Sequence, residues 1–367
     1  MRILLTIGHP AHVHYFRNFI KIMEKKGHEF LVIAKNRNVT YSLLEANNIP
    51  FVKRKDYPKS LWRKLINVPL TDLFVMYHSI KFKADILMGF SGTFIAHAGK
   101  FLNIPSVVID DTEHASLAHA SYKPFAKHIL TPSTFYKDLG SKQIKFDGYM
   151  ELCYLHPKYF KPDPSILDLL KLKNDEKYII FRFVSWNATH DVGHQGLSLD
   201  MKYKAVEEMS KYAKVFISSE LDLPDELKKH QIKIPSERMH DALYYADLLY
   251  GESATMASEC ACLGTPSIFI DNDGRGYTDE EEKKYGLVFN FKETIDGQEA
   301  SIQKALQLLK NDNLKRNWQE SSKKMIADKI NVTDFFVWYF EEYPKSNQLM
   351  LDDPIETQKR FRKKINL

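Results

Sequence analysis

The sequence has few cysteines, glycines and prolines, and it has no long hydrophobic run. Its three cysteines, Cys153, Cys260 and Cys262, are an odd and sparse set that does not form a disulfide framework. Gly and Pro number only 15 each among 367 residues, which excludes fibrous classes. No segment approaches the ~18–20 apolar residues of a membrane span. The N-terminus also lacks the long apolar core and small-residue cleavage site of a signal peptide, so we expect a cytoplasmic protein.

The chain also lacks a strong charge of one sign. Lys and Arg number 52 against 47 Asp and Glu, which leaves a formal net charge of +5. This weak basic bias permits an anionic ligand but does not indicate a nucleic-acid-binding surface. The hydrophobic fraction of 44% is that of a folded protein, and the length suggests about two domains of roughly 150 residues each.

Short apolar runs alternate with amphipathic stretches in the first part of the chain. The runs are rich in Ile, Val and Leu and are bounded by Gly, Pro or Asp. Because their hydrophobicity is continuous, we expect strands buried on both faces, as in a parallel sheet. Residues 14–26 carry apolar side chains at three- and four-residue spacing, which is typical of an amphipathic helix. The predicted strands cover residues 3–7, 30–34, 85–90, 106–110 and 128–130.

A second series of the same kind follows a crossing rich in prolines and aromatic residues. Its predicted strands cover residues 178–185, 214–218, 247–251, 266–270 and 287–291. The repeated alternation of strand and helix predicts a doubly wound α/β domain in each part of the chain. We therefore place an N-terminal domain at 1–150 and a C-terminal domain at 151–330.

The chain ends in an aromatic segment and a basic segment. Residues 331–345 are predicted to form a helix that packs back on the N-terminal domain. Residues 346–367 are predicted to be a polar tail whose cations lie at 358–364. A solvated terminus explains such a run of charge, and contact with an anionic membrane surface is the alternative.

The most informative stretch is 246–270, which reads ADLLYGESATMASECACLGTPSIFI. A strand ends at Gly251, small residues follow, and a helix then begins. Small residues at a helix start let an anion approach the free backbone N–H groups, and Ser253 and Thr255 add hydroxyl donors. Glu259, one to two turns into the helix, is suitably placed for a diol such as ribose. The alternative is an ordinary helix capped by Ser253 or Thr255.

This stretch resembles the donor-site motif of the GT-B superfamily of nucleotide-sugar enzymes. It is similar to the segment of the non-hydrolysing UDP-N-acetylglucosamine 2-epimerases that holds two glycines, a glutamate and Leu-Gly-x-Pro. The resemblance implies that Ser253, Ala254 and Thr255 meet the diphosphate, with Glu252 beside them, and that Glu259 holds the ribose hydroxyls. Ala254 and Thr255 stand where the family has its glycines.

The loop at 8–16, GHPAHVHYF, follows the first predicted strand and opens a helix. It resembles the His-bearing loop of the peptidoglycan glycosyltransferase that acts on a lipid-linked acceptor. The resemblance implies that His12 is catalytic, because an imidazole can take a proton from an acceptor hydroxyl. His9 and His14 would lie on the acceptor side. Each histidine could instead cap or pack the helix. The resemblance implies neither a bound metal nor a cofactor.

Residues 85–114 resemble the acceptor-side unit of the same superfamily. Ser91, Gly92 and Thr93 would line the acceptor side. Asp111 and Glu113 would lie at the carboxyl end of a strand, where open α/β sheets place ligands. Carboxylates at that position could supply a catalytic base or hold sugar hydroxyls, and they could equally cap the next helix.

Two further groups are predicted to contact the donor. Ser185 and Asn187 lie in the loop after the first strand of the second domain, which faces the donor in this superfamily. Arg275 follows a later strand and is a candidate for a phosphate contact. The His-Arg-Arg-Glu-Asn type motif of the epimerases is absent here. Their acidic catalytic set is not reproduced either, since GFSGT stands where an aspartate is wanted. We therefore rank sugar transfer above epimerisation.

These observations predict an α/β protein of GT-B fold, with two Rossmann-like doubly wound domains that face each other across a cleft. We expect a metal-independent glycosyltransferase that moves a sugar from a nucleotide-diphospho-sugar, most simply a UDP-sugar, to a saccharide or lipid-linked acceptor in cell-surface polysaccharide synthesis. The alternatives are a nucleotide-sugar 2-epimerase and a non-catalytic nucleotide-sugar-binding protein. We expect no nucleic-acid partner, and peripheral membrane contact is left open.

Overall fold

The computed structural model describes residues 1–54, 61–173, 176–184, 196–220, 222–311 and 313–362. The chain divides into two compact units. The first contains Met1–Tyr154 together with Lys329–Leu367, and the second contains Leu155–Asp328. The chain therefore leaves the first unit once and returns to it at Lys329.

The first unit is built on a seven-stranded parallel sheet in the order β3-β2-β1-β4-β5-β6-β7. Its central strands are rich in buried apolar residues because helices cover both faces of the sheet. Ile3, Leu4 and Leu5 of β1, for example, have no exposed surface. The strands are β1 (Arg2–Ile7), β2 (Glu29–Lys35), β3 (Phe51–Arg54), β4 (Ile86–Phe90), β5 (Ser106–Ile109), β6 (His128–Pro132) and β7 (Gln143–Phe146).

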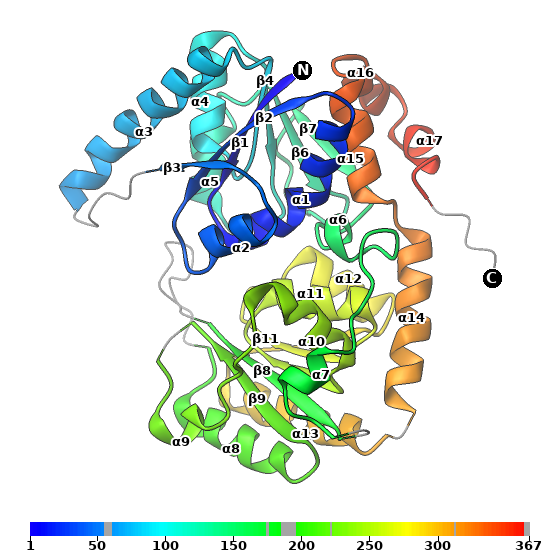
Figure 1. Ribbon diagram of the computed structural model, residues 1–367. Helices are drawn as coiled ribbons and strands as arrows, with labels where there is room; N and C mark the ends of the chain where they lie inside the picture. The colour runs from blue at the N-terminus through cyan, green and yellow to red at the C-terminus, as the bar shows by residue number, and fades with distance from the viewer. Residues whose placement is uncertain (55–60, 174–175, 185–195, 221, 312, 363–367) are drawn as a thin grey trace. The chain divides into compact units, whose positions relative to one another are not determined.

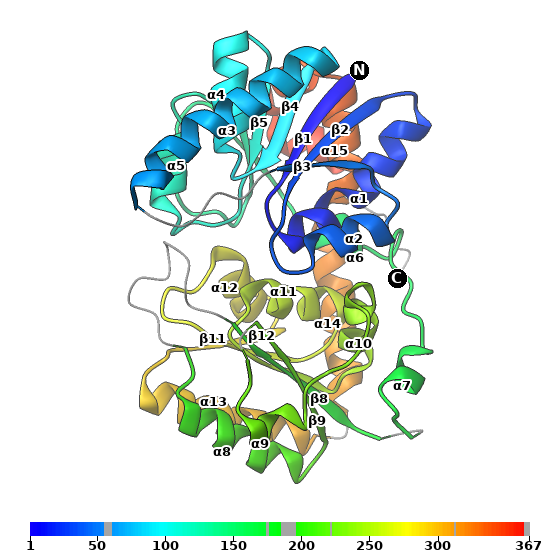
Figure 2. The ribbon, with the colours of Figure 1, turned by 60° about the vertical axis from the view of Figure 1, so that its left-hand side comes forward.

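Helices flank this sheet on both sides, which makes the unit doubly wound (Figure 2). Helix α4 packs on β4 and β5, whereas α1 packs on β1 and β2 and also against α15. The helices are α1 (Pro10–Lys25), α2 (Thr40–Ala46), α3 (Leu61–Phe82), α4 (Thr93–Leu102), α5 (Ser116–Tyr122), α6 (Leu152–Leu155) at the unit boundary, α15 (Val332–Glu341), α16 (Lys345–Asp352) and α17 (Pro354–Lys359).

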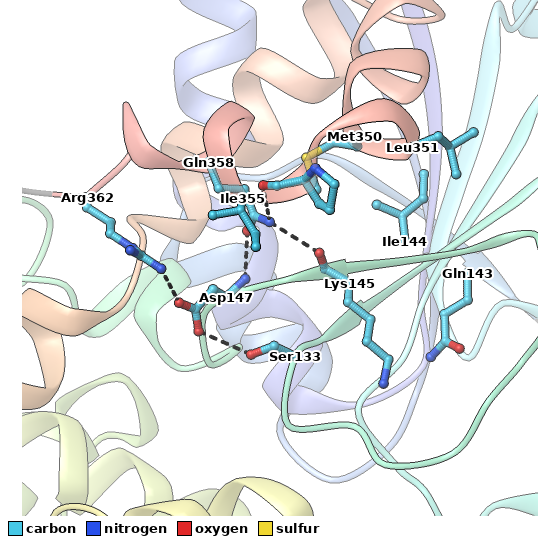
Figure 3. A pocket seen from close by; sticks show the side chains of 11 residues that line it. Ser133, Gln143, Ile144, Lys145, Asp147, Met350, Leu351, Ile355, Gln358 and Arg362 are labelled. Atoms are coloured by element: carbon cyan, nitrogen blue, oxygen red, sulfur yellow. Dashed lines mark hydrogen bonds and ion pairs between the residues drawn. The ribbon is translucent and has the colours of Figure 1, made fainter.

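The C-terminal segment differs from the polar tail that the composition suggests. Residues 345–359 form α16 and α17, and α17 contacts β7. Gln358 is buried, and its Oε1 accepts a hydrogen bond of 2.7 Å from the backbone N–H of Asp147. Arg362 pairs with the Asp147 carboxylate at 2.6 Å (Figure 3). Gln358 and Arg362 both bond to Asp147, the residue that follows β7, and so hold the C-terminal segment on the first unit. The basic run is therefore part of the fold as far as Arg362.

The second unit is built on a five-stranded parallel sheet in the order β12-β11-β10-β8-β9. Its strands are β8 (Tyr178–Phe183), β9 (Lys214–Ser219), β10 (Leu248–Gly251), β11 (Ser267–Ile270) and β12 (Val288–Phe291). Its helices are α7 (Ile166–Leu169), α8 (Leu199–Ser210), α9 (Asp225–Lys228), the 3₁₀ turn η1 (Ser236–Arg238), α10 (Met239–Tyr245), α11 (Ala254–Leu263), α12 (Gly276–Lys283), α13 (Ile295–Leu309) and α14 (Leu314–Asp328) (Figure 1).

Each sheet has one point at which the strand order reverses. In the first unit it lies between β1 and β4, and in the second it lies between β8 and β10. Open α/β sheets bind ligands outside the carboxyl ends of the strands at such a point. We therefore expect ligand-binding residues in the loops after β1 and β4, and in those after β8 and β10.

Candidate functional site

The reversal point of the second unit brings the end of β10 directly to the start of α11. Gly251 is paired with Arg182 of β8, and a Cβ added at Gly251 would lie 2.1 Å from the Arg182 carbonyl oxygen. Ser253 is the N-cap of α11, and its Oγ accepts a hydrogen bond of 3.3 Å from the Met256 backbone N–H. Ala254 and Thr255 are the first two helical residues and are half-buried. Their backbone N–H groups belong to the turn that has no intrahelical acceptor.

Glu259 lies farther along α11 and is held by a histidine from the preceding helix. The Glu259 side chain is buried, and its Oε1 is 3.0 Å from Nε2 of His240 on α10. His240 is itself only 3% exposed. A buried carboxylate that is bonded on one oxygen has a fixed orientation. His240 was not among the predicted site residues. It is the one histidine among residues 237–251, the segment that leads into the motif, and that was the signal in the sequence.

The Glu252 carboxylate is engaged by the chain's own backbone. It is buried, and its two oxygens accept hydrogen bonds from the backbone N–H groups of Val184 at 2.9 Å and Leu197 at 2.6 Å. Lys202 approaches the same carboxylate at 3.3 Å. Glu252 thus connects Val184, just after β8, with Leu197. Ser185 and Asn187, which we predicted to contact the donor, lie within the segment 185–195 and outside the described residues.

Arg275 lies at the same edge of the sheet, after β11, and is engaged by its own loop. Its Nη1 donates to the Gly274 carbonyl oxygen at 2.5 Å and lies 3.5 Å from Oδ1 of Asp271. The Arg275 side chain is 14% exposed. The guanidinium is therefore positioned by Asp271 at the carboxyl end of β11.

The reversal point of the first unit gives the three histidines of the first loop different environments. His9 is the N-cap of α1, and its Nδ1 accepts from the Ala11 backbone N–H at 3.2 Å. His14 is buried and stacks on Tyr154, with ring centroids 5.3 Å apart. These two residues perform the structural roles that we left open.

His12 is held in one tautomer. Its Nδ1 accepts a hydrogen bond of 3.3 Å from the Gly8 backbone N–H, so in the neutral ring the proton is on Nε2. Burial, with His9 and Arg37 nearby, holds the pKa of His12 well below its ordinary value. His12 is therefore a neutral hydrogen-bond donor through Nε2. This geometry opposes the general-base role that the resemblance implies, because a base needs a lone pair where His12 carries a proton.

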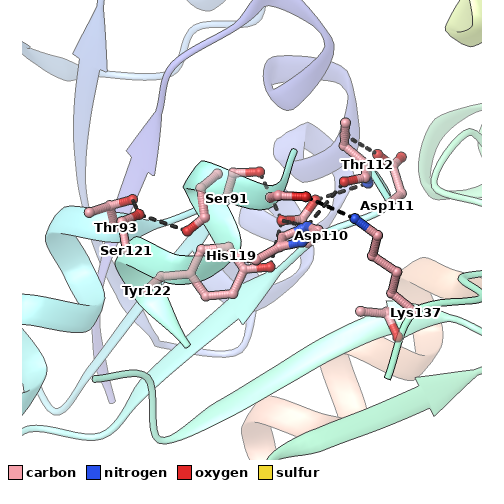
Figure 4. A network of polar contacts seen from close by, with 12 residues as sticks. Ser91, Thr93, Asp110, Asp111, Thr112, His119, Ser121, Tyr122 and Lys137 are labelled. Atoms are coloured by element: carbon pink, nitrogen blue, oxygen red, sulfur yellow. Dashed lines mark hydrogen bonds and ion pairs between the residues drawn. The ribbon is translucent and has the colours of Figure 1, made fainter. Parts of the chain in front are cut away.

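The loop after β4 is tied to the end of β5 by Asp110 (Figure 4). Ser91 has a positive φ of 45° and donates from Oγ to Oδ2 of Asp110 at 3.1 Å. The same carboxyl accepts from Tyr122 at 2.7 Å and from the Thr112 backbone N–H at 2.9 Å. Burial raises the pKa of Asp110. Gly92 is the N-cap and Thr93 the first residue of α4. Asp110 thus orders this edge rather than reacting.

Asp111 and Glu113 follow on the same loop and are both buried. Asp111 accepts a hydrogen bond of 3.0 Å from its neighbour Thr112 and is 8% exposed, against 1% for Glu113. Of the two predicted catalytic carboxylates, Asp111 is therefore the more accessible.

No described helix has both the length and the hydropathy that a membrane crossing requires. The described histidines, cysteines and carboxylates also form no group of three that could hold a metal ion.

A family model described as "Protein of unknown function (DUF354)" matches residues 1–318. The chain belongs to the DUF354 family. One relative of this DUF354 protein, an uncharacterized protein of Methanocaldococcus jannaschii, is 25% identical over a match of 282 residues. The match covers 72% of this chain and 80% of the relative.

Two solved structures are similar to it over nearly their whole length. The UDP-GlcNAc 2-epimerase of Neisseria meningitidis, solved with UDP-GlcNAc, has a TM-score of 0.64 at 13% identity and covers 89% of this chain and 98% of its own. The spinosyn rhamnosyltransferase SpnG, solved with spinosyn aglycone, has a TM-score of 0.58 at 14% identity. The match covers 93% of this chain and 99% of SpnG. The predicted GT-B fold is thus confirmed, and at such low identity the likeness extends to the fold alone.

Proposed function

We propose that this DUF354 protein is a glycosyltransferase whose second unit binds a nucleotide-diphospho-sugar, with UDP as the expected nucleotide. The observation that carries the proposal is the start of α11. There, the N–H groups of Ala254 and Thr255 face the reversal point of the sheet, and Glu259 is fixed by His240 one to two turns later. A helix start favours a diphosphate, and an oriented carboxylate suits the vicinal hydroxyls of a ribose.

We assign the base to Asp111 and a donor role to His12. The Asp111 carboxylate takes the proton of the acceptor hydroxyl while that oxygen bonds to the anomeric carbon. The bond from this carbon to the phosphate oxygen breaks, and its electron pair leaves with the nucleoside diphosphate. Backbone N–H groups of α11 and Arg275 stabilise the charge that develops on the departing diphosphate.

Binding of the donor tests the first half of this proposal. Nucleotide sugars and UDP should raise the melting temperature of the protein, because a ligand that binds only the folded state stabilises it. Glu259→Gln should abolish most of that shift. The matched control is Glu299→Gln, which changes an exposed glutamate of the same unit that pairs with Lys204 at the surface. If no nucleotide or nucleotide sugar shifts the melting temperature, the assignment of the second unit is wrong.

Release of UDP in the presence of acceptor sugars tests the second half. Asp111→Asn should abolish transfer, because the amide cannot take the proton. His12→Gln keeps a hydrogen-bond donor and should keep a measurable rate. If His12→Gln loses all transfer activity while Asp111→Asn remains active, the base is His12 and not Asp111.

A nucleotide-sugar 2-epimerase is the second candidate. The two buried carboxylates at the end of β5, Asp111 and Glu113, favour it, since an acid and a base could both come from this loop. Incubation with UDP-N-acetylglucosamine and no acceptor separates the candidates. Epimerised product would support the epimerase, and intact donor that is consumed only when an acceptor is added would support transfer.

A further inference from the structure

An exposed apolar stripe runs along α3 in the first unit. The α3 stripe consists of side chains spaced by three or four residues, which places them on one face of the helix: Leu70, Leu73, Tyr77 and Ile80. All of them are exposed, and Ile80 is 61% exposed. The opposite face of α3 packs on the unit, because its side chains are buried: Thr71, Val75 and Ser79. The helix thus presents apolar side chains to solvent from residue 70 to residue 80.

Helix α4 extends this apolar surface. It packs against α3, and its Phe101 is 69% exposed. Helix α3 joins the end of β3 to the start of β4, and α4 joins the end of β4 to the start of β5. Because the strands are parallel, both helices end at the edge of the sheet where the strands begin (Figure 2). Phe101 therefore lies at the same end of the unit as Tyr77 and Ile80. Exposed apolar side chains that gather in this way mark an interaction surface.

The segment that carries these side chains is basic. Residues 61–101 contain five cations and two acids, namely Arg63, Lys64, Lys81, Lys83 and Lys100 against Asp72 and Asp85. Both acids are engaged by the first unit itself. Asp72 lies 3.0 Å from Nδ1 of His97, and Asp85 accepts a hydrogen bond of 2.6 Å from the Arg2 backbone N–H.

Lysines face solvent where α3 and α4 end. Those that the two helices and the following loop contribute are all exposed: Lys81, Lys83 and Lys100. Nζ of Lys81 lies 5.9 Å from the centroid of the Tyr77 ring, at the border of the α3 stripe. Burial, with Lys100 and Lys127 nearby, lowers the pKa of Lys142, so these three cations lie close together. Positive charge therefore gathers at the end of the sheet where the α3 stripe ends.

We propose that the α3 stripe and Phe101 bind the surface of a membrane that contains anionic lipids. An amphipathic helix with basic borders lies in the interface, with its apolar face about 5–10 Å into the boundary between headgroups and acyl chains. Anionic headgroups attract lysines that lie near such a surface. This surface belongs to the first unit alone, so it goes beyond the proposed function and does not depend on donor binding.

A second copy of the chain is the other partner that could cover the α3 stripe, and the charge argues against it. Two copies would bring two basic segments together, and like charges at an interface repel. An anionic membrane surface carries the opposite charge. Charge complementarity therefore favours lipid headgroups over a second copy.

Flotation with lipid vesicles tests the proposal on the full chain. Wild-type protein should float with vesicles of phosphatidylcholine and phosphatidylglycerol in equal amounts, and much less with vesicles of phosphatidylcholine alone. The double variant Leu73→Gln, Ile80→Gln should bind about tenfold or more weakly, because less apolar surface is buried in the lipid. Lys83→Gln and Lys100→Gln should each weaken the binding about fivefold, and high salt should weaken it further because salt screens the charges.

The matched controls change side chains of similar exposure elsewhere on the chain. Ile295→Gln lies on α13 of the second unit and Ile355→Gln on α17 of the C-terminal segment, and both isoleucines are 70% exposed. Lys283→Gln removes the same charge from an exposed position of α12. All three control variants should bind the anionic vesicles as wild type does.

The proposal is wrong if wild-type protein does not float with the anionic vesicles, or if a control weakens the binding as much as its counterpart on α3 or α4. It is also wrong if the double variant keeps its vesicle binding and converts a dimer to a monomer in light scattering, because a second copy then covers the α3 stripe. UDP affinity should be the same in all these variants. A protein that floats but does not bind UDP would refute the proposed function and leave the membrane surface standing.

Discussion

Replacing His240 should change how the protein recognises the ribose of the nucleotide, and not merely how tightly it binds. His240 Nε2 lies 3.0 Å from Oε1 of Glu259, and both side chains are buried. If Glu259 bonds the ribose hydroxyls, wild-type protein should prefer UDP over 2′,3′-dideoxy-UDP. A hydrogen bond to a charged group contributes about 1.5–3 kcal/mol, which corresponds to roughly a 10- to 100-fold preference.

His240→Leu removes the donor that orients Glu259, so the preference for UDP should fall to a few-fold. His240→Gln keeps an N–H donor of similar reach and should retain most of the preference. Glu259→Gln should lose it as His240→Leu does. The measurement is the ratio of the two dissociation constants, obtained by calorimetry for each variant.

The ratio distinguishes positioning from general damage to the fold. A variant that is only less stable would lose affinity for UDP and for 2′,3′-dideoxy-UDP equally, and urea unfolding measures that loss of stability separately. A folded His240→Leu protein that prefers UDP as strongly as wild type would refute the reasoning. A wild-type protein that binds both nucleotides equally would show that Glu259 does not contact the ribose.

Three more results are expected from purified protein. Gly251→Ala should destabilise the fold by about 3 kcal/mol or more in urea unfolding, because the added Cβ would lie 2.1 Å from the Arg182 backbone oxygen. In the control Gly8→Ala, the added Cβ would lie 3.9 Å from a side-chain atom, so this variant should lose little stability. Glu252→Gln should cost about 1–3 kcal/mol, since an amide cannot accept from both the Val184 and the Leu197 N–H groups. Burial lowers the pKa of His128 to about 4, so unfolded chains take up this proton near pH 6.5 and folded ones only near pH 4. Stability should therefore fall as the pH drops from about 6.5 to 4, by roughly 1–2 kcal/mol for this partly exposed ring, and His128→Asn should remove that part of the pH dependence.

The sequence reveals the strands that form continuous apolar runs, including β9 and β12 at the edges of the second sheet, and misses both edge strands of the first sheet. All the predicted strands exist, because residues such as those of β1 and β10 form continuous apolar runs between helices. Strands β3 and β7 were missed. Each is four residues long and carries a lysine, and each lies at an edge of its sheet, where one side of the strand is less covered and the hydrophobic signal is weaker. The folded part of the C-terminal segment was missed because its contacts with β7 run between residues about 210 positions apart in the sequence.

For the site residues, a motif predicts the position in the fold but not the hydrogen bonds of individual atoms. A motif predicts which loop or helix start carries a residue: Ser253 follows β10, Asp111 follows β5, and His12 lies in the first turn of α1. It does not predict which atoms of the residue are already hydrogen-bonded within the protein. Gly8 decides the tautomer of His12 with one backbone N–H, and Val184 and Leu197 occupy the carboxylate of Glu252. Since proton transfer depends on a lone pair at one particular atom, we propose Asp111, after β5, as the base in place of the histidine that the motif favours.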